Sequence, residues 1–189
     1  MKVGDEVELY GLSRTSKRTT ITGIETFRKT LDHGEAGDNL GVLVRSLTKE
    51  DLSRGKVLAK PGSLVVNRRF DATLYVLKEE EGGRSKPFTN GYRPQAFLRT
   101  ADMAAEITLK NNKAMAMPGD NLEVECYLAY PLPLFKGQRF ALREGGKTVA
   151  AGVISNILKD DEKDEELGFK KKSIHKLQKI QAEEEAAAK

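Results

Sequence analysis

The residues that first suggest chemistry are Gly145–Thr148, whose sequence GGKT resembles the end of a phosphate-binding loop. A Walker A motif needs another glycine five residues before the glycine that precedes the lysine, and Ala141 occupies that position. The motif also leads into a helix, because helical N–H groups hold the phosphates. Here the segment TVAAGVI follows, which is typical of a strand. The sequence therefore predicts no nucleotide site at this position.

The histidines and the cysteine do not form a catalytic or metal-binding pattern. His33 and His175 are isolated from each other and from any cysteine cluster, which argues against zinc. Cys126 is the only cysteine and lies in the alternating segment LEVECYLAY, so we expect its side chain to point into a core. No serine–histidine–aspartate set or carboxylate pair stands out. We therefore expect no catalytic residues and no metal site, and the chain does not look like an enzyme by itself.

The stretch with the strongest functional signal is the predicted loop Gly82–Thr100, GGRSKPFTNGYRPQAFLRT. It is dense in glycine, proline and basic residues, and loops of this length inside a compact domain usually carry function. The whole chain has a formal net charge of +4 and a pI of about 9.0. This balance is compatible with a polyanionic partner such as RNA, although many ordinary proteins share it. No apolar run reaches the length of a membrane span, so we expect no membrane partner.

The elements that must position this loop are predicted to be strands. Short alternating or β-branched segments recur roughly every 8 to 12 residues between turn residues, which indicates a sandwich or barrel. The predicted strands are VELYG, Arg18–Phe27, Leu40–Leu47, Phe70–Leu77, the segment around Cys126, and a hairpin that turns at Glu144–Gly146. Thr48–Gly55 reads as a single helical turn that Thr48 caps.

Composition divides the chain into three parts. Pro61 and Gly62 are the best domain boundary, which separates residues 1–62 from residues 63–158. Residues 159–189 begin with the charge run KDDEKDEELG, which predicts a solvated linker, and continue with good helix formers. Apolar residues spaced three apart form only a thin stripe on this expected tail helix. It is either a marginal solvated helix or a helix that becomes ordered against a protein partner.

Six segments are similar, in order and spacing, to the C-terminal part of bacterial and organellar elongation factor Tu. They span roughly Lys2–Leu158 and read KVGDEVELYGL, TGIETFRKTLDHGEAGDNLGVLVR, RGKVLAKPGS, EGGRSKPFTNGYRPQAFLRT, MPGDN and RFALREGGKTVAAGV. That family has an N-terminal GTPase domain followed by two β-barrels. The resemblance implies an all-β chain of two antiparallel β-barrels, domains II and III. The first barrel is expected to be incomplete, and a charged helical extension follows the second.

The resemblance also implies what this chain lacks. The GTPase domain and the opening strands of domain II are expected to be absent. GTP and Mg would then bind only to a GTPase domain supplied elsewhere, and this chain would hold no cofactor. A barrel that lacks strands exposes unpaired edges and part of its core, so it should recruit a partner or aggregate.

Three residues of the first domain match positions that bind the aminoacylated 3′ end of tRNA. Glu25 matches the residue that packs on the terminal adenine, Arg28 an arginine of the aminoacyl pocket, and Asn39 the residue whose backbone meets the aminoacyl group. Charge and stacking suit this role, because an unpaired base offers a π-face and an ester end offers acceptors. The alternative is that these residues serve only the turns and the strand edge.

Five residues of the second domain match an RNA surface or an interface. Arg84, Gln95 and Gly145 match positions on the T-stem surface, where contacts to phosphate and 2′-OH read shape. Arg99 and Ala141 are expected at an interface between domains or with a partner.

Four positions of the second domain depart from the family pattern. Ser85 replaces a histidine, Ala104 a threonine that contacts T-stem RNA, Ala96 an aromatic residue and Ala150 a glycine. The loss of an imidazole and of a polar contact from one face suggests relaxed selection on tRNA binding.

The resemblance leaves three explanations of the chain open: a fragment of a full-length factor, a split-gene product, or a degenerate relative kept as a subunit. We expect the tRNA-facing half of a split or remodelled organellar elongation factor. The alternative is a structural subunit of a large organellar assembly such as a mitochondrial ribosome. The expected partners are aminoacyl-tRNA or ribosomal RNA, together with a GTPase-domain polypeptide or ribosomal and assembly proteins. The expected location is the mitochondrial matrix, with a plastid or the bacterial cytoplasm as alternatives.

Overall fold

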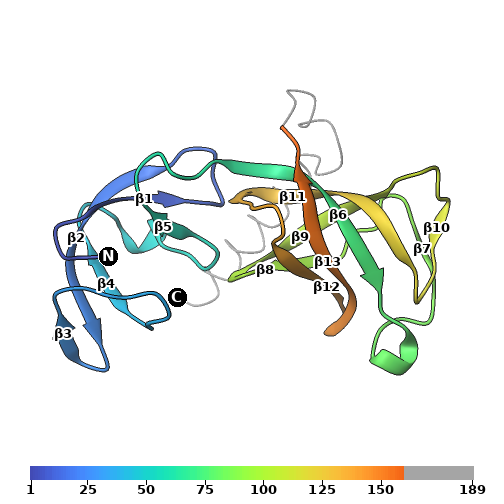
Figure 1. Cartoon of the computed structure of the whole chain (residues 1–189), viewed down its shortest axis with the longest axis horizontal. Helices are drawn as coiled ribbons and strands as arrows, with labels where there is room; N and C mark the ends of the chain where they lie inside the picture. Colours follow the sequence, from blue (N-terminus) through green and yellow to red (C-terminus); the bar gives the residue numbers. More distant parts are fainter. Residues whose placement is uncertain (160–189) are drawn as a thin grey trace, which may run out of the picture.

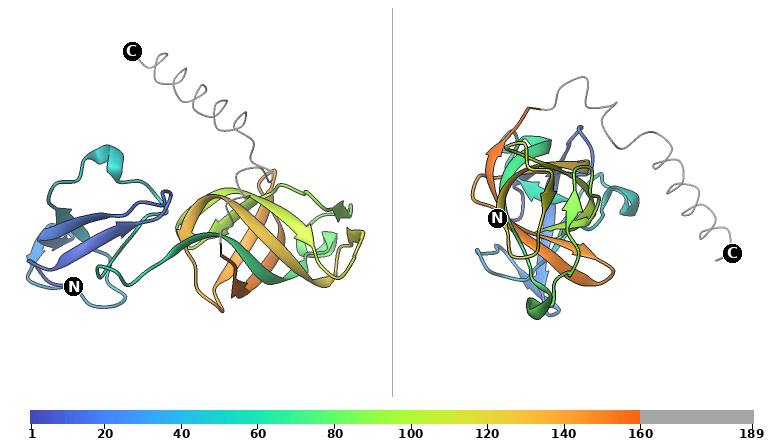
Figure 2. Two further views of the ribbon diagram at one scale, coloured as in Figure 1. Left: turned by 90° about the horizontal axis from the view of Figure 1, so that it is seen from above. Right: turned by 90° about the vertical axis from the view of Figure 1, so that its right-hand side faces the viewer.

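The computed structural model describes residues 1–159 as two all-β lobes that lie one after the other along the long axis (Figure 1). We call residues 1–62 the first lobe and residues 63–158 the barrel. The view from above in Figure 2 shows that one extended segment links the two lobes. The expected tail helix lies outside the described residues. Within residues 1–159 no helix is long and apolar enough to cross a membrane.

The first lobe is an open antiparallel sheet. Its strands are β1 (Glu6–Tyr10), β2 (Lys17–Thr26), β3 (Lys29–Leu31), β4 (Gly41–Val44) and β5 (Val57–Ala59). They run in the order β3-β2-β1-β5, and β4 also pairs with β2. Only Val7, Ile21 and Ile24 form its buried apolar cluster, and the side chains packed against them are partly exposed. The first of the two expected barrels is therefore a sheet that does not close within the described residues.

The expected helical turn at Thr48–Gly55 is a short 3-10 turn, Lys49–Asp51, that begins after Thr48. The Asp51 carboxylate accepts from the Thr48 N–H at 3.1 Å and from the Lys17 ammonium. These donors, Lys17 first, lower the pKa of Asp51 to about 2.

The second lobe is a closed six-stranded barrel in the order β11-β6-β13-β12-β8-β9. Its strands are β6 (Val66–Val76), β8 (Gln95–Leu98), β9 (Ala101–Leu109), β11 (Asn121–Pro133), β12 (Arg139–Glu144) and β13 (Lys147–Ile157). At one end, η2 (Glu79–Glu81) follows β6, and the short strands β7 (Phe88–Thr89) and β10 (Met115–Ala116) pair with each other. Side chains alternate between interior and surface, and Cys126 is fully buried, as predicted.

The stretch Gly82–Thr100, predicted as one long loop, is partly strand, so that prediction is wrong for Gln95–Leu98. Gln95–Leu98 forms the barrel strand β8, which pairs with both β9 and β12. Ala96 and Leu98 are buried in the barrel, and this burial fixes the segment as a strand although it is only four residues long. The predicted hairpin at Glu144–Gly146 is confirmed: Glu144 pairs with Lys147 across two glycines of positive φ.

Several contacts join the first lobe to the barrel, among them a 3.6 Å ion pair between Arg54 and Asp102. The Arg54 guanidinium donates to the Thr100 carbonyl at 2.9 Å, and the Leu12 N–H donates to the Pro131 carbonyl at 2.8 Å. Gly55 is buried against Ala101, and a Cβ at Gly55 would lie 2.9 Å from the Ala101 Cβ. These contacts involve only a few residues of each lobe. The position of the first lobe relative to the barrel therefore depends on a small contact area.

A buried carboxylate fastens the first lobe to the segment that leads to the barrel. Glu8 is 8% exposed and accepts hydrogen bonds from the Ser16 and Tyr10 hydroxyls, both at 2.5 Å, and from the Gly62 N–H at 2.8 Å. These donors lower the pKa of Glu8 to about 2, with Ser16 as the largest cause. The ionised form is therefore the one that the fold stabilises.

Glu8→Gln should make the free energy of unfolding depend less on pH in the acid range. The folded-state pKa is depressed, so its contribution to stability is present above about pH 4.5 and is lost as the pH falls towards about 2. The urea midpoint of the wild type should fall through this window, and the midpoint of Glu8→Gln should fall less. Glu6→Gln, at an exposed position of the same strand, is the control. Equal acid sensitivity of wild type and Glu8→Gln would contradict this role.

Gly55→Ala should loosen the contact between the lobes. Gly55 has a φ of +96°, which strains the backbone of an alanine, and the added Cβ would also clash with Ala101. Gly37→Ala is the matched control, because Gly37 has φ +101° but nothing within 4 Å of its added Cβ. We expect Gly55→Ala to lower the free energy of unfolding by about 1 to 2 kcal/mol more than Gly37→Ala does, as measured by urea unfolding. Equal losses would show that the contact carries no stability.

Candidate nucleic-acid interface

The first candidate surface is a cavity on the first lobe between two turns. Glu25 and Arg28 come from the β2–β3 hairpin, and Asn39 comes from the segment before β4. All three line one cavity of about 260 Å³. The other lining residues are Thr26, Phe27, Leu40 and Gly41. The structure thus brings together the three residues that the resemblance assigns to the aminoacyl end of tRNA.

Backbone pairing and one side-chain bond hold the walls of this cavity. Glu25 pairs with Gly41 across β2 and β4, and the Thr26 hydroxyl donates to the Asn39 carbonyl at 2.9 Å. A Cβ at Gly41 would lie 3.1 Å from the Glu25 Cγ, so glycine leaves room for the carboxylate arm. A carbonyl has two lone pairs, so the Asn39 backbone keeps acceptor capacity for a ligand.

The turn beside this cavity has an unusual sequence for its shape. Thr26 pairs with Lys29, and the two residues between them, Phe27 and Arg28, have φ of +44° and +68°. Two-residue hairpin loops of this kind favour Asn-Gly, because side chains with a Cβ are strained at positive φ. The Phe27 side chain is 90% exposed. Strain combined with exposure of an aromatic ring is typical of a functional turn.

Phe27 gives the cavity a stacking surface that the sequence interpretation missed. An exposed aromatic ring stacks on an unpaired base with about 1 to 3 kcal/mol per base. Arg28 and Glu25 beside it offer a hydrogen-bond donor and an acceptor for the polar edges of such a ligand. The sequence predicts Phe27 as the last residue of a strand. The signal that identifies it is an aromatic residue next to an arginine in a two-residue connection between strands.

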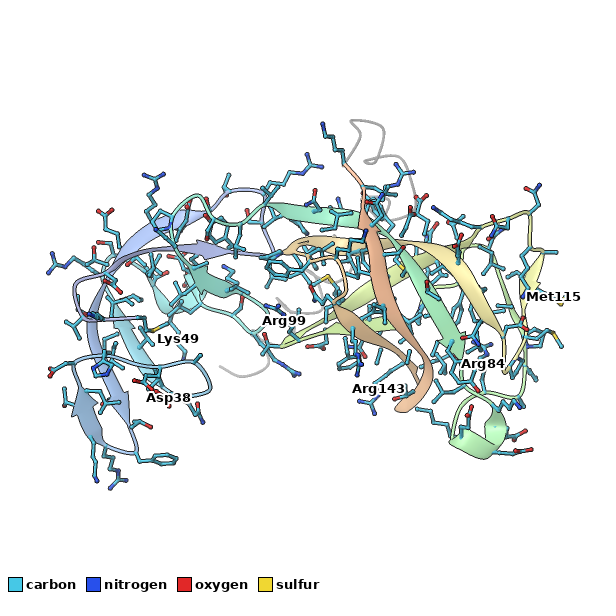
Figure 3. The ribbon with its side chains drawn as sticks, in the orientation of Figure 1. Asp38, Lys49, Arg84, Arg99, Met115 and Arg143 are labelled. Atoms are coloured by element: carbon cyan, nitrogen blue, oxygen red, sulfur yellow. The ribbon has the colours of Figure 1, made fainter. Side chains whose placement is uncertain are left out.

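The second candidate surface lies at the end of the barrel away from the first lobe, around Arg84 (Figure 3). The Arg84 side chain is only 17% exposed and stacks over the rings of Tyr92 at 4.8 Å and Phe88 at 5.5 Å. It also donates to the Lys86 carbonyl at 2.6 Å and lies 3.3 Å from the Glu144 carboxylate. Arg84 therefore holds the loop that precedes β8 against the barrel.

Tyr92 completes this arrangement. Its hydroxyl donates to Glu144 at 3.0 Å, and its ring stacks on Phe88 with centroids 4.5 Å apart. Burial and the bond to Glu144 raise the pKa of Tyr92 to about 12. The phenol stays protonated and keeps donating throughout the physiological range.

Gln95 and Gly145 lie on the same part of the barrel as Arg84. Gln95 begins β8 opposite Arg143 of β12, and its amide donates to Asp102 at 2.9 Å. Gly145 is exposed in the β12–β13 turn, directly after Glu144. Glu144 binds Arg84, so the three predicted T-stem residues occupy one neighbourhood.

Two lysines near Arg84 were absent from the sequence prediction. Lys86 and Lys147 line a second cavity of about 260 Å³, together with Glu79, Gly83, Arg84, Ser85, Glu144 and Val149. Both lysines are exposed and suit contact with a phosphate. Only the fold brings them together, because they are far apart in the sequence and belong to different elements.

Arg99 and Ala141, the predicted interface residues, lie apart from each other. Arg99 sits in the β8–β9 turn with φ +54° and stacks over the Phe135 ring at 4.8 Å. It adjoins Thr100, which accepts from Arg54 of the first lobe. Ala141 lies within β12, where it pairs with Phe97 and Ala151. Arg99 is thus next to the contact between the lobes, and Ala141 belongs to the barrel wall.

The histidine, cysteine and acidic side chains of the described part of the chain are those that could form a metal site or a reactive thiol. No group of three histidine, cysteine or acidic side chains within residues 1–159 is placed to hold a metal ion. The Cys126 thiol is fully buried, and burial raises its pKa well above the ordinary value. What the two surfaces offer is stacking, hydrogen bonding and positive charge.

Replacing Phe27–Arg28 by Asn-Gly should stabilise the first lobe. The new pair tolerates positive φ, and few contacts are lost because Phe27 is almost fully exposed. We expect the free energy of unfolding to rise by about 1 kcal/mol in urea titrations. Gly145→Asn, in the β12–β13 turn whose glycines already have positive φ, is the control and should change little. A loss of stability in F27N/R28G would show that this turn is not strained.

Comparison with known families matches both lobes. The sequence model described as elongation factor Tu domain 2 matches residues 1–59, and the model described as elongation factor Tu C-terminal domain matches residues 63–158. The two matches meet at the Pro61–Gly62 segment that separates the lobes. The second match alone covers more than half of the chain. The chain therefore belongs to the elongation factor Tu family, of which it contains domain 2 and the C-terminal domain.

Proposed function

We propose that this protein binds aminoacyl-tRNA, with the 3′ end in the cavity of the first lobe and the T-stem on the barrel around Arg84. It acts as the tRNA-facing half of a split or remodelled organellar elongation factor. In this proposal GTP and Mg bind to a GTPase-domain polypeptide supplied elsewhere, and the support is that the two matched models are those of domains 2 and 3. The chain itself contributes binding and orientation.

The observation that carries this proposal is the grouping of Glu25, Arg28 and Asn39 around one cavity beside the exposed ring of Phe27. An unpaired 3′ end has a base that stacks on an aromatic ring and polar groups that take hydrogen bonds. A strained turn that displays an aromatic residue has no evident structural use in this lobe, since the ring is 90% exposed.

The barrel surface supports contact with a duplex. Gly145 presents a backbone turn without a side chain, and Lys86 and Lys147 supply positive charge beside it. Contacts of this kind read the shape and phosphates of RNA rather than its sequence. In this proposal Arg84 positions the loop that carries Lys86.

A second candidate function is a structural subunit of a large organellar assembly without a role in tRNA delivery. It is favoured by Gln95, whose amide already donates to Asp102. Opposite Gln95 on β9 stands Ala104, which has no polar group to offer RNA. Both features reduce the polar contacts available on the barrel.

The site of action that we propose is the mitochondrial matrix, with a plastid or the bacterial cytoplasm as alternatives. The support is the long charged segment from Lys159 onwards, which lies beyond the residues that the family models match. A fluorescent fusion of the full chain distinguishes these compartments.

The proposal is tested by binding to an acceptor-arm RNA hairpin in two forms, one with a complete aminoacylated 3′ end and one without the terminal nucleotide. Phe27→Ala should weaken binding of the complete RNA about tenfold, from the loss of one base stack, and leave the shortened RNA unaffected. Leu43→Ala, which removes another exposed apolar side chain of the first lobe, is the matched control and should be neutral.

Equal affinity for the two RNAs, or equal effects of Phe27→Ala and Leu43→Ala, would refute the 3′-end assignment. Absence of RNA binding together with association with ribosomal particles after a high-salt wash would establish the structural-subunit alternative. Affinity of the chain alone for GTP would contradict the assignment of the nucleotide to another polypeptide.

A further inference from the structure

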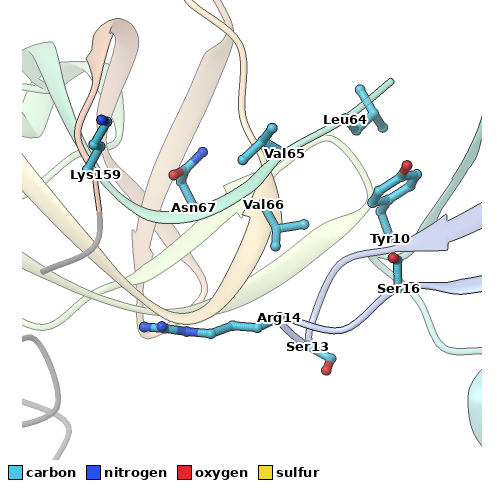
Figure 4. Close-up of a pocket in the computed structure, with 9 residues that line it drawn as sticks. All are labelled: Tyr10, Ser13, Arg14, Ser16, Leu64, Val65, Val66, Asn67 and Lys159. Atoms are coloured by element: carbon cyan, nitrogen blue, oxygen red, sulfur yellow. The ribbon is translucent and has the colours of Figure 1, made fainter. Parts of the chain in front are cut away.

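A cleft of about 500 Å³ lies where the first lobe meets the start of the barrel, and neither RNA surface includes it. Figure 4 shows that Ser13, Arg14 and Ser16 approach it from the β1–β2 connection. Leu64–Asn67 crosses it as the chain enters β6, and Lys159 adjoins it after the end of β13. The cleft therefore combines two cationic side chains with hydroxyl, amide and apolar groups.

The cleft runs along a part of β6 that β13 does not cover. β13 pairs with β6 as far as Ile157 opposite Phe70, and the Leu158 N–H then donates to the Arg69 carbonyl at 3.0 Å. Within residues 1–159, Val66 and Asn67 have ladder partners only on the β11 side. If the same antiparallel register continued, residue 160 would stand opposite Asn67 and residue 161 opposite Val66. An extended peptide thus has backbone groups to pair with in this cleft.

The charge of the cleft favours carboxylates. Arg14 and Lys159 are both exposed cations. Glu8 binds two residues of the cleft lining, because its carboxylate accepts hydrogen bonds from Ser16 and Tyr10 as well as from the Gly62 N–H. An anionic peptide is attracted by both cations. It would also bury an apolar strip of the cleft that is exposed to solvent and includes Val65, which is 73% exposed.

A segment of this chemistry follows Lys159 in the sequence. Residues 160–166 read DDEKDEE, six acidic residues and one lysine, and they lie outside the described residues. Attachment to Lys159 gives this segment a high effective concentration at the cleft. We propose that the cleft between the lobes binds an acidic peptide segment, and that the segment is the chain's own residues 160–166. This binding would join the end of β13 to Arg14 of the first lobe and so fasten the lobes together.

Disulfide trapping in the full chain tests the proposal. Ser13→Cys is combined with Glu162→Cys, and the control combines Ala114→Cys, an exposed position next to β10 at the far end of the barrel, with the same Glu162→Cys. The native Cys126 is fully buried and does not compete. We expect the first pair to form an intramolecular disulfide about tenfold faster than the control, because binding raises the local concentration of one thiol at the other. Equal rates, or a disulfide that forms only between two copies, would overturn the proposal.

Charge reversal separates binding from mere proximity. Arg14→Glu lies in an exposed loop and should slow trapping about fivefold, as expected from losing one or two partly exposed ion pairs. Asp160→Lys with Asp161→Lys in the same chain should restore the rate. Raising salt from about 0.05 to about 0.5 M should slow trapping in the parent and not in Arg14→Glu. A trapping rate that changes neither with Arg14→Glu nor with salt would refute an electrostatic site. Circular dichroism of each variant verifies the fold.

Discussion

Closure of the six-stranded barrel is the constraint on which the rest of the structure depends. Each strand has partners on both sides, so the barrel has no free edge along most of its length, and its interior is filled by side chains such as Phe70, Leu74 and Leu142. The fit is close: a Cβ at Gly152 would lie 2.5 Å from the Phe140 ring, which in turn packs edge-on against Phe70 at 5.4 Å. Burial of each such side chain stabilises the fold by about 1.5 to 3 kcal/mol.

The closed barrel also fixes both of its ends. At one end the β12–β13 turn holds Glu144 where it binds Arg84 and Tyr92, so the loop before β8 has a defined position. At the other end the β8–β9 turn and β11 present Thr100 and Pro131 to the first lobe. The buried apolar cluster of the first lobe consists of only three side chains, those of Val7, Ile21 and Ile24. The strained Phe27–Arg28 turn of this lobe therefore lies in the part of the molecule with the smaller core, where local opening costs least.

Much of this architecture follows from local pattern. Alternation predicted the strands around Phe70–Leu77 and Cys126, and two adjacent glycines predicted the β12–β13 hairpin. Strand β8 was not predictable in the same way, because four residues hold only two periods of alternation and the proline and glycine before them indicate a loop. The segment becomes a strand only because it pairs with β9, which follows it in the sequence, and with β12, which lies far along the chain.

The candidate sites were predictable to different degrees for a physical reason. The residues of the first cavity belong to two turns within one short stretch, so a sequence motif can contain them together. The inward position of Arg84 depends on Glu144, 60 residues away, and on the rings of Phe88 and Tyr92, so no local pattern reveals it. Likewise, the exposure of Phe27 depends on a positive φ that its residue type disfavours.

The distance between the two candidate surfaces places a demand on any ligand that uses both. The first cavity lies by the β2–β3 hairpin at one end of the long axis, and Arg84 lies at the opposite end of the barrel (Figures 1 and 3). A ligand that touches both must be long and stiff, with an unpaired end, as a nucleic-acid arm is. Its affinity then depends on the angle between the lobes, because a second contact adds to the first only when the geometry allows both. The described contacts that set this angle include those of Arg54, Gly55, Leu12 and the Glu8 network. For a ligand that bridges both candidate surfaces, residues remote from either surface would therefore influence affinity through the arrangement of the lobes.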